Sequence, residues 1–415
     1  MYIIDSTKYS GPCSTCGKDH AMETKLAVIE AGCLQHLDEY LEKYGLTGKR
    51  CAIYDEKTYV AKGLVRPAAQ QEIILPPENL HANEHGVAMV QQQLQQDVEV
   101  LIAVGSGTVH DITRYVAWEK GIPFVSCPTA ASVDGFCSGV ASMTWEGCKK
   151  TLTAVPPTLV LADLNVITQA PIRLARSGFG DMIGKYIALF EWRMAKALVG
   201  ESYCHRIDQM TMDATKAVLD SAAGIAAGEP AAFGNLTYGL ILSGLAMQMW
   251  GNSRPASGTE HHISHIIEME PPLLNVHSDG LHGEKVGVGT LLAAKEYHRL
   301  AQLPDDVWGD YPGIDDNTLQ QVFGPEMSGP SIRENEKDCA AGITGEQIRK
   351  ILPVIRQEIQ SIPQPETLLE AYNRIGAMTT LSEIQVPDDL EQTLYRTCPM
   401  VRNRLTLMRL RRCIQ

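Results

Sequence analysis

The feature that most limits the fold of this chain is the alternation of short β-rich runs with helix-length segments between residues 25 and 165. Parallel strands must be joined by crossover connections, which are usually helical. The alternation therefore predicts an α/β region with a mostly parallel, doubly wound sheet. The predicted strands are Leu26–Ile29, Cys51–Tyr54, Ile73–Leu75, Val98–Val104, Phe124–Ser126 and Leu159–Leu161, and the predicted helices include Ala31–Tyr44, Val87–Asp97 and Val109–Lys120.

The character of the chain changes near Ala170, after which almost every segment has helical periodicity. A chain of 415 residues exceeds the usual size of one domain. We expect an α/β domain at residues 1–168 and an all-helical domain at 169–415. Residues 139–153 predict a hairpin that turns near Glu146, the apolar run Gly239–Trp250 predicts a buried helix, and Leu303–Gly345 is typical of a loop-rich surface insertion.

Composition excludes several functional classes. The formal net charge of −13 argues against a nucleic-acid or anionic-membrane partner. Eleven cysteines at irregular spacing do not form the pattern of a secreted disulfide scaffold. We expect a cytoplasmic protein, because no signal peptide or membrane-spanning run is evident. The five arginines of Arg402–Arg412 predict a solvated helix or an interface face.

The N-terminal motif C-S-T-C-G-K-D-H places Cys13, Cys16 and His20 at the spacing of three zinc ligands. A structural zinc site needs four ligands, and no fourth stands at a matching spacing. A turn carrying thiols is therefore the favoured interpretation, and a redox function of the cysteine pair stays open.

Two polar loops follow neighbouring predicted strands. Gly105-Ser106-Gly107-Thr108 comes directly before a helix, where glycine lets a phosphate approach the backbone N–H groups at the helix start. The motif is not G-x-G-x-x-G, because His110 takes the last glycine position, so a tight turn without a ligand is an equal alternative. The second loop spans Pro128 to Ser138. Because such sheets bind ligands at the carboxyl ends of their strands, the two loops together suggest a dinucleotide crevice.

A histidine-rich stretch predicts a metal site in the helical half. His261 and His265 are four residues apart and share one helix face, whereas His262 points elsewhere. His282, after a loop, adds a third imidazole, and Asp181 offers a carboxylate. Isolated motifs of this kind are often ordinary histidines, and an acidic residue early in a helix is often a dipole partner. Lys185, one turn beyond Asp181, could form only an i,i+4 ion pair.

With these residues assembled, the chain resembles the sn-glycerol-1-phosphate dehydrogenase family, most of all its bacterial, AraM-like members. That family belongs to the larger group of dehydroquinate synthases, iron-type alcohol dehydrogenases and glycerol dehydrogenases. The likeness covers nearly the whole chain. The motifs that carry it are P-T-A-A-S-V-D-G-F at 128–136, G-F-G-D-M-I-G-K at 178–185, S-R-P-A-S-G-T-E-H-H-I-S-H at 253–265 and H-G-E-K-V-G-V-G at 282–289.

The resemblance implies an NAD- or NADP-dependent homodimeric oxidoreductase that interconverts dihydroxyacetone phosphate and sn-glycerol 1-phosphate. One divalent metal (zinc, nickel or iron) is expected on Asp181, His261 and His282, where it polarises the carbonyl. Asp134, Asp181 and His265 are expected to contact substrate, and a water or His265 to relay the proton. The residues expected to bind the dinucleotide are Asp55, Gly105, Gly107, Thr108, Val109, His110, Asp111, Thr129, Ala130, Ala131, Ser132 and Ser138.

Some assignments have stated alternatives. Arg254, Lys185 and Lys285, with His265, are the charges available for a substrate phosphate, but Arg254 and Lys285 serve equally well as structural ion-pair partners. His277 competes with His282 as a ligand, because Glu268–Asp279 is long for the family. Rival functions are a glycerol or other polyol dehydrogenase, a lyase like dehydroquinate synthase, and a catalytically silent binding protein.

Overall fold

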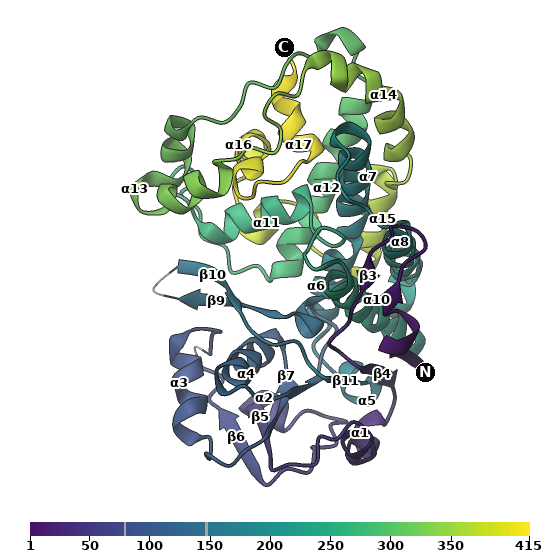
Figure 1. Cartoon of the computed structure of the whole chain (residues 1–415), viewed down its shortest axis with the longest axis vertical. Coiled ribbons are helices and arrows are strands. Elements are labelled where there is room, and N and C mark those ends of the chain that lie inside the picture. Colours follow the sequence, from purple (N-terminus) through teal and green to yellow (C-terminus); the bar gives the residue numbers. More distant parts are fainter. Residues whose placement is uncertain (79, 146–147) are drawn as a thin grey trace. The chain divides into compact units, whose positions relative to one another are not determined.

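The computed structural model describes residues 1–78, 80–145 and 148–415, and the chain divides into two compact units (Figure 1). Unit 1 consists of Met1–Met182 and Lys216–Asn252. Unit 2 consists of Ile183–Thr215 and Ser253–Gln415. Each unit is therefore built from two separate stretches of chain.

Unit 1 contains a seven-stranded sheet in the order β1-β4-β11-β8-β7-β5-β6. All neighbours in it are parallel except β1, which pairs antiparallel with β4 at the edge. The six predicted strands are confirmed, whereas β1 was not predicted. The strands are β1 Tyr2–Asp5, β4 Leu26–Glu30, β5 Arg50–Asp55, β6 Gln71–Leu75, β7 Val100–Gly105, β8 Phe124–Pro128 and β11 Leu159–Asp163.

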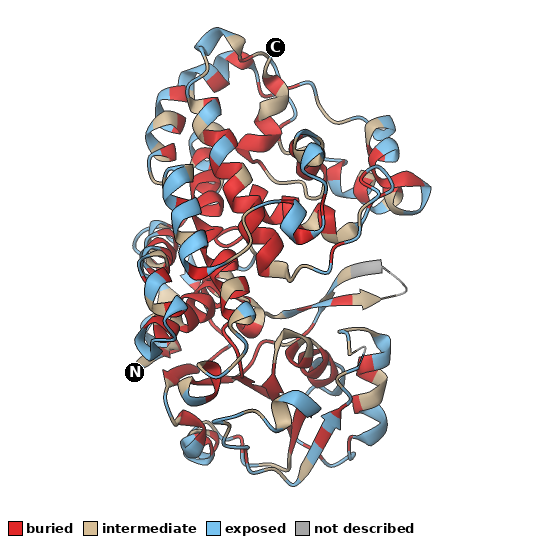
Figure 2. Ribbon diagram, turned by 180° about the vertical axis from the view of Figure 1, so that it is seen from behind, coloured by how far each residue is buried: buried red, intermediate tan, exposed pale blue. Residues whose placement is uncertain are grey.

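Helices cover both faces of this sheet, which explains why its central strands are continuous apolar runs. On one face, α3 (Glu84–Gln93) and α4 (Gly107–Lys120) pack in a cluster with Ile53 and Leu101. On the other, α1 (Leu37–Lys43) packs in a cluster with alternate residues of the same strands. Figure 2 shows the central strands almost wholly in the colour of buried residues.

The predicted hairpin is present as the antiparallel pair β9 (Val140–Trp145) and β10 (Cys148–Thr153). The turn predicted at Glu146 and Gly147 lies outside the described residues. A second small antiparallel pair, β2 (Gly11–Pro12) and β3 (Asp19–His20), frames the N-terminal cysteine motif.

The order of strands creates a topological switch between β5 and β7. From β5 the chain moves outward to β6, and from β7 it moves the other way to β8. The loops after β5 and β7 therefore separate at the carboxyl edge, which is where open α/β sheets bind ligands. Thr58, in α2 (Glu56–Tyr59), donates its hydroxyl to the carbonyl of Val104 at 3.2 Å and links these two loops.

The division of the chain differs from a single boundary at residue 168, because a later helix returns to the sheet. Helix α10 (Pro230–Trp250) belongs to unit 1 and packs against β1 and β4. Tyr238 stacks on Tyr2 with ring centroids 4.9 Å apart, and the Tyr2 hydroxyl donates a hydrogen bond to the side-chain oxygen of Asn235. Burial of apolar surface on α10 determines that this helix packs against the sheet. The contact joins segments far apart in the sequence, so it leaves no local signal in the sequence.

Unit 2 is helical, as predicted, and α7 (Lys185–Val199) packs against three other helices at its centre. These partners are α11 (Thr259–Met269), α12 (His282–Ala301) and α14 (Gly345–Ile359). The other α-helices of the described residues are α5 Leu164–Ile167, α6 Ile172–Ile183, α8 His205–Asp220, α9 Ala222–Ala226, α13 Asp316–Asn335, α15 Pro365–Ile375, α16 Glu391–Thr397 and α17 Leu407–Leu410.

Two predictions about the later chain are wrong. The stretch Leu303–Gly345 contains α13, which kinks at Gly324 and buries Phe323, so it is not a loop-rich insertion. Of the two alternatives for the arginine-rich end, the solvated helix is wrong, because Arg409 is fully buried and bonded to Asp338. The interface face stays a prediction. Paired with carboxylates and carbonyls, guanidinium groups can be buried. None of the helices among the described residues has the length and apolar character needed to cross a bilayer.

Candidate active site

Three of the predicted histidines meet in unit 2. His261 and His265 project from the same face of α11, with ring centroids 5.9 Å apart. His282, the first residue of α12, lies 5.4 Å from the ring of His261 and 5.9 Å from that of His265. Spacing along α11 and the antiparallel return of α12 therefore gather three imidazoles in one place.

Glycine allows these two helices to approach closely. A Cβ atom at Gly289 would lie 2.6 Å from the carbonyl oxygen of Glu260, a distance that side chains do not tolerate. The close approach brings the start of α12 beside His261 and His265. The motif H-G-E-K-V-G-V-G thus serves helix packing as well as the site.

Two glutamates orient two of the histidines. Nδ1 of His261 lies 2.7 Å from Glu260, and Nδ1 of His282 lies 2.9 Å from Glu268. A carboxylate on Nδ1 holds the proton there and leaves the lone pair of Nε2 for a metal. Sequence analysis missed both glutamates, although each lies within seven residues of a predicted ligand on α11.

The electrostatics of this cluster favour neutral imidazole at His265. Burial lowers the pKa of His265 to about 3, although the nearby Glu268 charge favours the protonated ring. Burial by itself would raise the pKa of Glu268, but the charge and hydrogen bond of His282 outweigh it and hold that pKa below the usual carboxyl range. Donor atoms of His265, Glu268 and His282 also lie within 4.8 Å of one another.

The other two histidines of the stretch stand apart. His277 is exposed, with Nδ1 2.5 Å from Glu270 and Nε2 3.3 Å from Asp279. His262 is fully buried on another face of α11, and burial holds its pKa well below the usual value. Of the two ligand candidates His277 and His282, only His282 lies with His261 and His265.

In unit 1, the predicted carboxylates Asp134 and Asp181 come together. The backbone N–H of Asp134 donates to Oδ2 of Asp181 at 2.9 Å, and Ser243 donates its hydroxyl to Asp134 at 2.9 Å. Asp181 is fully buried on α6. A Cβ at Gly178 would lie 2.1 Å from the carbonyl oxygen of Ala131, so glycine is what lets α6 approach the loop that carries Asp134.

The glycine loop also has the predicted form. Strand β7 ends at Gly105, Ser106 is the N-cap and α4 begins at Gly107. A Cβ at Gly105 would lie 2.9 Å from Val109, so packing explains that glycine. A Cβ at Gly107 would meet only Val133, at 3.7 Å. Packing therefore does not require glycine at residue 107.

Comparison with known proteins identifies the family. A family model described as iron-containing alcohol dehydrogenase matches residues 28–171. The glycerol-1-phosphate dehydrogenase (NAD(P)+) of Bacillus licheniformis is 32% identical, over 96% of this chain and 91% of that relative. The enzyme of the same name from Geobacillus thermodenitrificans is 34% identical, over 92% and 90%. The chain belongs to the glycerol-1-phosphate dehydrogenase family.

A solved structure supports the fold of this family member. The iron-containing alcohol dehydrogenase of Corynebacterium glutamicum has a TM-score of 0.60 and 14% identity, and the alignment covers 94% of this chain and 95% of that one. At that identity the likeness concerns the fold alone.

Several residues that the glycerol-1-phosphate dehydrogenase resemblance assigns to the dinucleotide have structural partners. His110 is fully buried, with Nδ1 2.9 Å from the Ser106 carbonyl and Nε2 2.8 Å from the Ser126 hydroxyl. Asp55 caps α2 by accepting from two backbone N–H groups. Asp111 lies 3.6 Å from Arg114. Thr108, Val109, Thr129, Ala130, Ala131, Ser132 and Ser138 lie on α4 or on the loop after β8.

The three cations of this chain that are available for a substrate phosphate differ in their surroundings. Arg254 is buried and pairs with Glu201 at 2.8 Å, which favours its structural interpretation. Lys185 is fully buried at the start of α7. Lys285 lies 4.0 Å from Glu268, beside the histidines. Arg402 was not predicted here, yet its charge adds to the effect of burial in lowering the pKa of His265.

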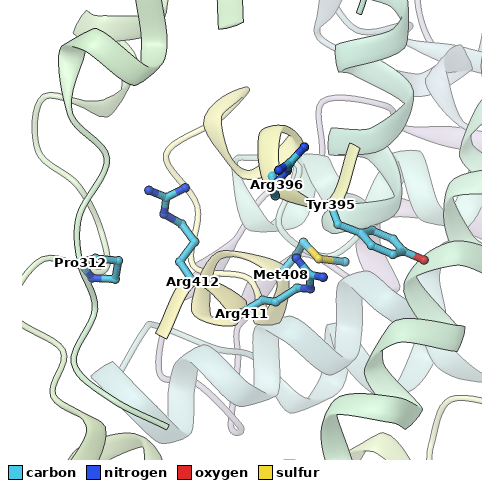
Figure 3. A pocket seen from close by; sticks show the side chains of 6 residues that line it. All are labelled: Pro312, Tyr395, Arg396, Met408, Arg411 and Arg412. Atoms are coloured by element: carbon cyan, nitrogen blue, oxygen red, sulfur yellow. The ribbon is translucent and has the colours of Figure 1, made fainter. Parts of the chain in front are cut away.

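A pocket in unit 2 is lined by other arginines of this chain. None of the predicted site residues lines it. Figure 3 shows Arg411 and Arg412 at its wall. Arg411 donates to Glu296 and Gln392, and Arg412 donates to the carbonyl of Gly313. These contacts stabilise the C-terminal segment, and we assign the pocket no catalytic part.

Proposed function

We propose that this chain reduces dihydroxyacetone phosphate to sn-glycerol 1-phosphate with NADH or NADPH in a metal-dependent reaction. The observation that carries the proposal is the pair His261 and His282, each with a glutamate on Nδ1. An imidazole held in this way presents Nε2 as a ligand. Relatives named glycerol-1-phosphate dehydrogenase over nearly the whole chain support the substrate.

The proposed metal ligands are Asp181, His261 and His282, with zinc or nickel as the first choices and iron as the third. Two imidazoles and a carboxylate suit all three metals and leave positions for substrate oxygens. A divalent metal held there would polarise a carbonyl and stabilise the developing negative charge on its oxygen. The set His265, Glu268 and His282 is the competing proposal, supported by the short separation of its donor atoms.

The proposed dinucleotide site is the carboxyl edge of the sheet at the switch between β5 and β7. Open space at Gly107 supports binding of the pyrophosphate to the first N–H groups of α4. The bound nicotinamide would supply the hydride. The loop from Thr129 to Ser138 borders the same edge, because the N–H of Thr129 donates to the carbonyl of Gly105 at 3.1 Å.

The chain's own residues hold the substrate and move its proton. A neutral His265 can donate a hydrogen bond to a substrate hydroxyl and pass a proton to it, and Asp134 can accept from another hydroxyl. For the phosphate we propose Lys285 and Arg402, which lie near the histidine cluster, with Lys185 as a further cation. Arg254 acts as a structural support through Glu201.

The deciding experiment compares dihydroxyacetone phosphate with dihydroxyacetone on one preparation. Oxidation of NADH or NADPH is followed, and the reduced product is identified by its stereochemistry. A site built for phosphate should favour the phosphorylated substrate by several orders of magnitude in kcat/KM, because unpaired donors reject the truncated ligand. Comparable efficiencies would support the polyol dehydrogenase instead. Turnover without net consumption of nucleotide would support the lyase.

Two broader properties are part of the same proposal. We propose a homodimer, as the family resemblance implies, and a cytoplasmic location, as the irregular spacing of the cysteines suggests. Light scattering after gel filtration measures the oligomeric state, and cell fractionation of the tagged protein measures the cellular location.

A further inference from the structure

The N-terminal motif forms a small framed turn in unit 1. Strands β2 and β3 pair antiparallel, with Gly11 opposite His20. Between them, the N–H of Cys13 donates to the Lys18 carbonyl and the N–H of Gly17 donates to the Cys13 carbonyl, both at 2.9 Å. Gly17 has a φ of +71°, which favours glycine and closes the turn. The turn therefore brings Cys13 and Cys16 to the same side as His20.

The side chains of this turn have the arrangement of metal ligands. The Sγ atom of Cys16 lies 3.3 Å from Nε2 of His20, and the donor atoms of Cys13, Cys16 and His20 all lie within 4.8 Å of one another. Cys13 is 4% exposed and His20 is 2% exposed. The exposed turn therefore directs two of these side chains, Cys13 and His20, inward.

The imidazole of His20 is fixed in the tautomer that a metal needs. Its Nδ1 lies 2.9 Å from the carbonyl oxygen of Met249. A carbonyl only accepts, so Nδ1 carries the proton and Nε2 directs a lone pair toward the sulfur of Cys16. Metal-binding histidines are commonly oriented by a carbonyl on the second nitrogen in this way.

We propose that Cys13, Cys16 and His20 bind a zinc ion. Two thiolates and one imidazole are among the ligands that zinc sites in proteins use. Binding of Zn²⁺ releases the thiol protons to solvent, and no oxidation takes place.

This site is separate from the proposed catalytic metal site in residues and in chemistry. The catalytic ligands offer nitrogen and oxygen, whereas this site offers two sulfur atoms and one nitrogen. Cobalt(II) replaces zinc in such sites, and only thiolate ligands give it a thiolate-to-metal charge-transfer band in the near ultraviolet. The full-length protein should therefore be purified from cells grown with cobalt and its absorption recorded together with cobalt per chain.

The wild-type protein should show the charge-transfer band, and added zinc should remove it. Cys13→Ser and Cys16→Ser should each weaken the band, and His282→Ala should leave it unchanged. Cys33→Ser is the matched control, because Cys33 is another buried cysteine of unit 1, and it should keep the full band. Cobalt-loaded wild-type protein without the band overturns the proposal, and this result needs no variant to fold. A full band in both Cys13→Ser and Cys16→Ser also overturns the proposal, because the two proposed thiolate ligands would then not be needed.

Discussion

At the scale of single residues, the two candidate metal ligands His282 and His277 differ clearly in their surroundings. His282 lies beside His261 with Nδ1 on Glu268, whereas His277 is exposed and paired with Glu270 and Asp279. We predict that His282→Ala removes the catalytic metal and turnover but leaves a folded protein, while His277→Ala retains both. Elemental analysis and circular dichroism of the two variants measure this. Full catalytic metal content in His282→Ala would show that the ligand assignment is wrong.

His110 gives a prediction for the pH dependence of stability. Burial lowers its pKa to about 3, from about 6.5 in the unfolded chain. Between these values the unfolded state binds the proton and the folded state does not, so stability falls as the pH drops from about 6.5 towards 3, by up to about 1.4 kcal/mol per pH unit. The acid limb is this fall in the free energy of unfolding between about pH 6.5 and pH 3, measured by urea unfolding. His110→Gln should make the acid limb shallower.

The matched control for His110 is an exposed histidine of the same unit. His36 is exposed and bonded to Glu39, so His36→Gln should leave the acid limb nearly as steep as in the wild type. An equal flattening in both variants would mean that the buried ring of His110 does not control the effect.

At the residue level, the sequence predicted which histidines come together but not the glutamates that orient them. Helix periodicity and a motif place His261, His265 and His282 in one cluster. Glu260 and Glu268 were not, because a carboxylate that orients a histidine is chosen by tertiary contact and has no fixed spacing. For the same reason Arg402 was assigned to a solvated helix or an interface face, since only the fold brings that segment near His265.

At the scale of elements, two glycines on different helices allow a direct comparison. A Cβ at Gly178 would lie 2.1 Å from the Ala131 carbonyl oxygen, whereas a Cβ at Gly107 would be 3.7 Å from its nearest neighbour. We predict that Gly178→Ala destabilises the protein by about 1–3 kcal/mol, because α6 must move away from the loop after β8. Gly107→Ala should leave the unfolding free energy nearly unchanged, and thermal unfolding of the pair measures the difference.

Larger side chains at residue 107 should affect the cofactor instead. Gly107→Val should raise KM for NADH by about tenfold or more, which corresponds to about 1.4 kcal/mol of binding, with little change in KM for the triose phosphate. Steady-state kinetics with each substrate varied in turn measures this. Equal increases in both constants would count against the placement of the pyrophosphate on α4.

Element prediction was accurate where a segment carries its own pattern. The six parallel strands, α4 and the hairpin have local signals in apolar runs and turn residues. Strand β1 had none of comparable strength, because it is a short edge strand that gains its partner β4 only in the fold. Helix α13 was missed because Gly324, Pro325 and Pro330 interrupt its pattern, although the flanking turns remain helical.

At the scale of the whole molecule, the composition of unit 1 predicts how fragments behave. A fragment of residues 1–168 lacks α10, which packs on β1 and β4. We predict that this fragment exposes the apolar face around Tyr2 and aggregates or binds a hydrophobic dye, whereas the full chain does neither. Dye fluorescence and sedimentation compare the two. A monomeric, cooperatively folding fragment would mean that α10 is not needed for the sheet.

Helix α10 also has a consequence for biosynthesis. Unit 1 is closed only by Lys216–Asn252, so its sheet remains unfinished on the ribosome while the intervening segment Ile183–Thr215 emerges. The nascent chain must keep the β1 face covered for that interval, which makes it a candidate substrate for chaperones that act during translation. A pause in translation near residue 182 would lengthen this exposure, and a pause after α10 has left the exit tunnel would not.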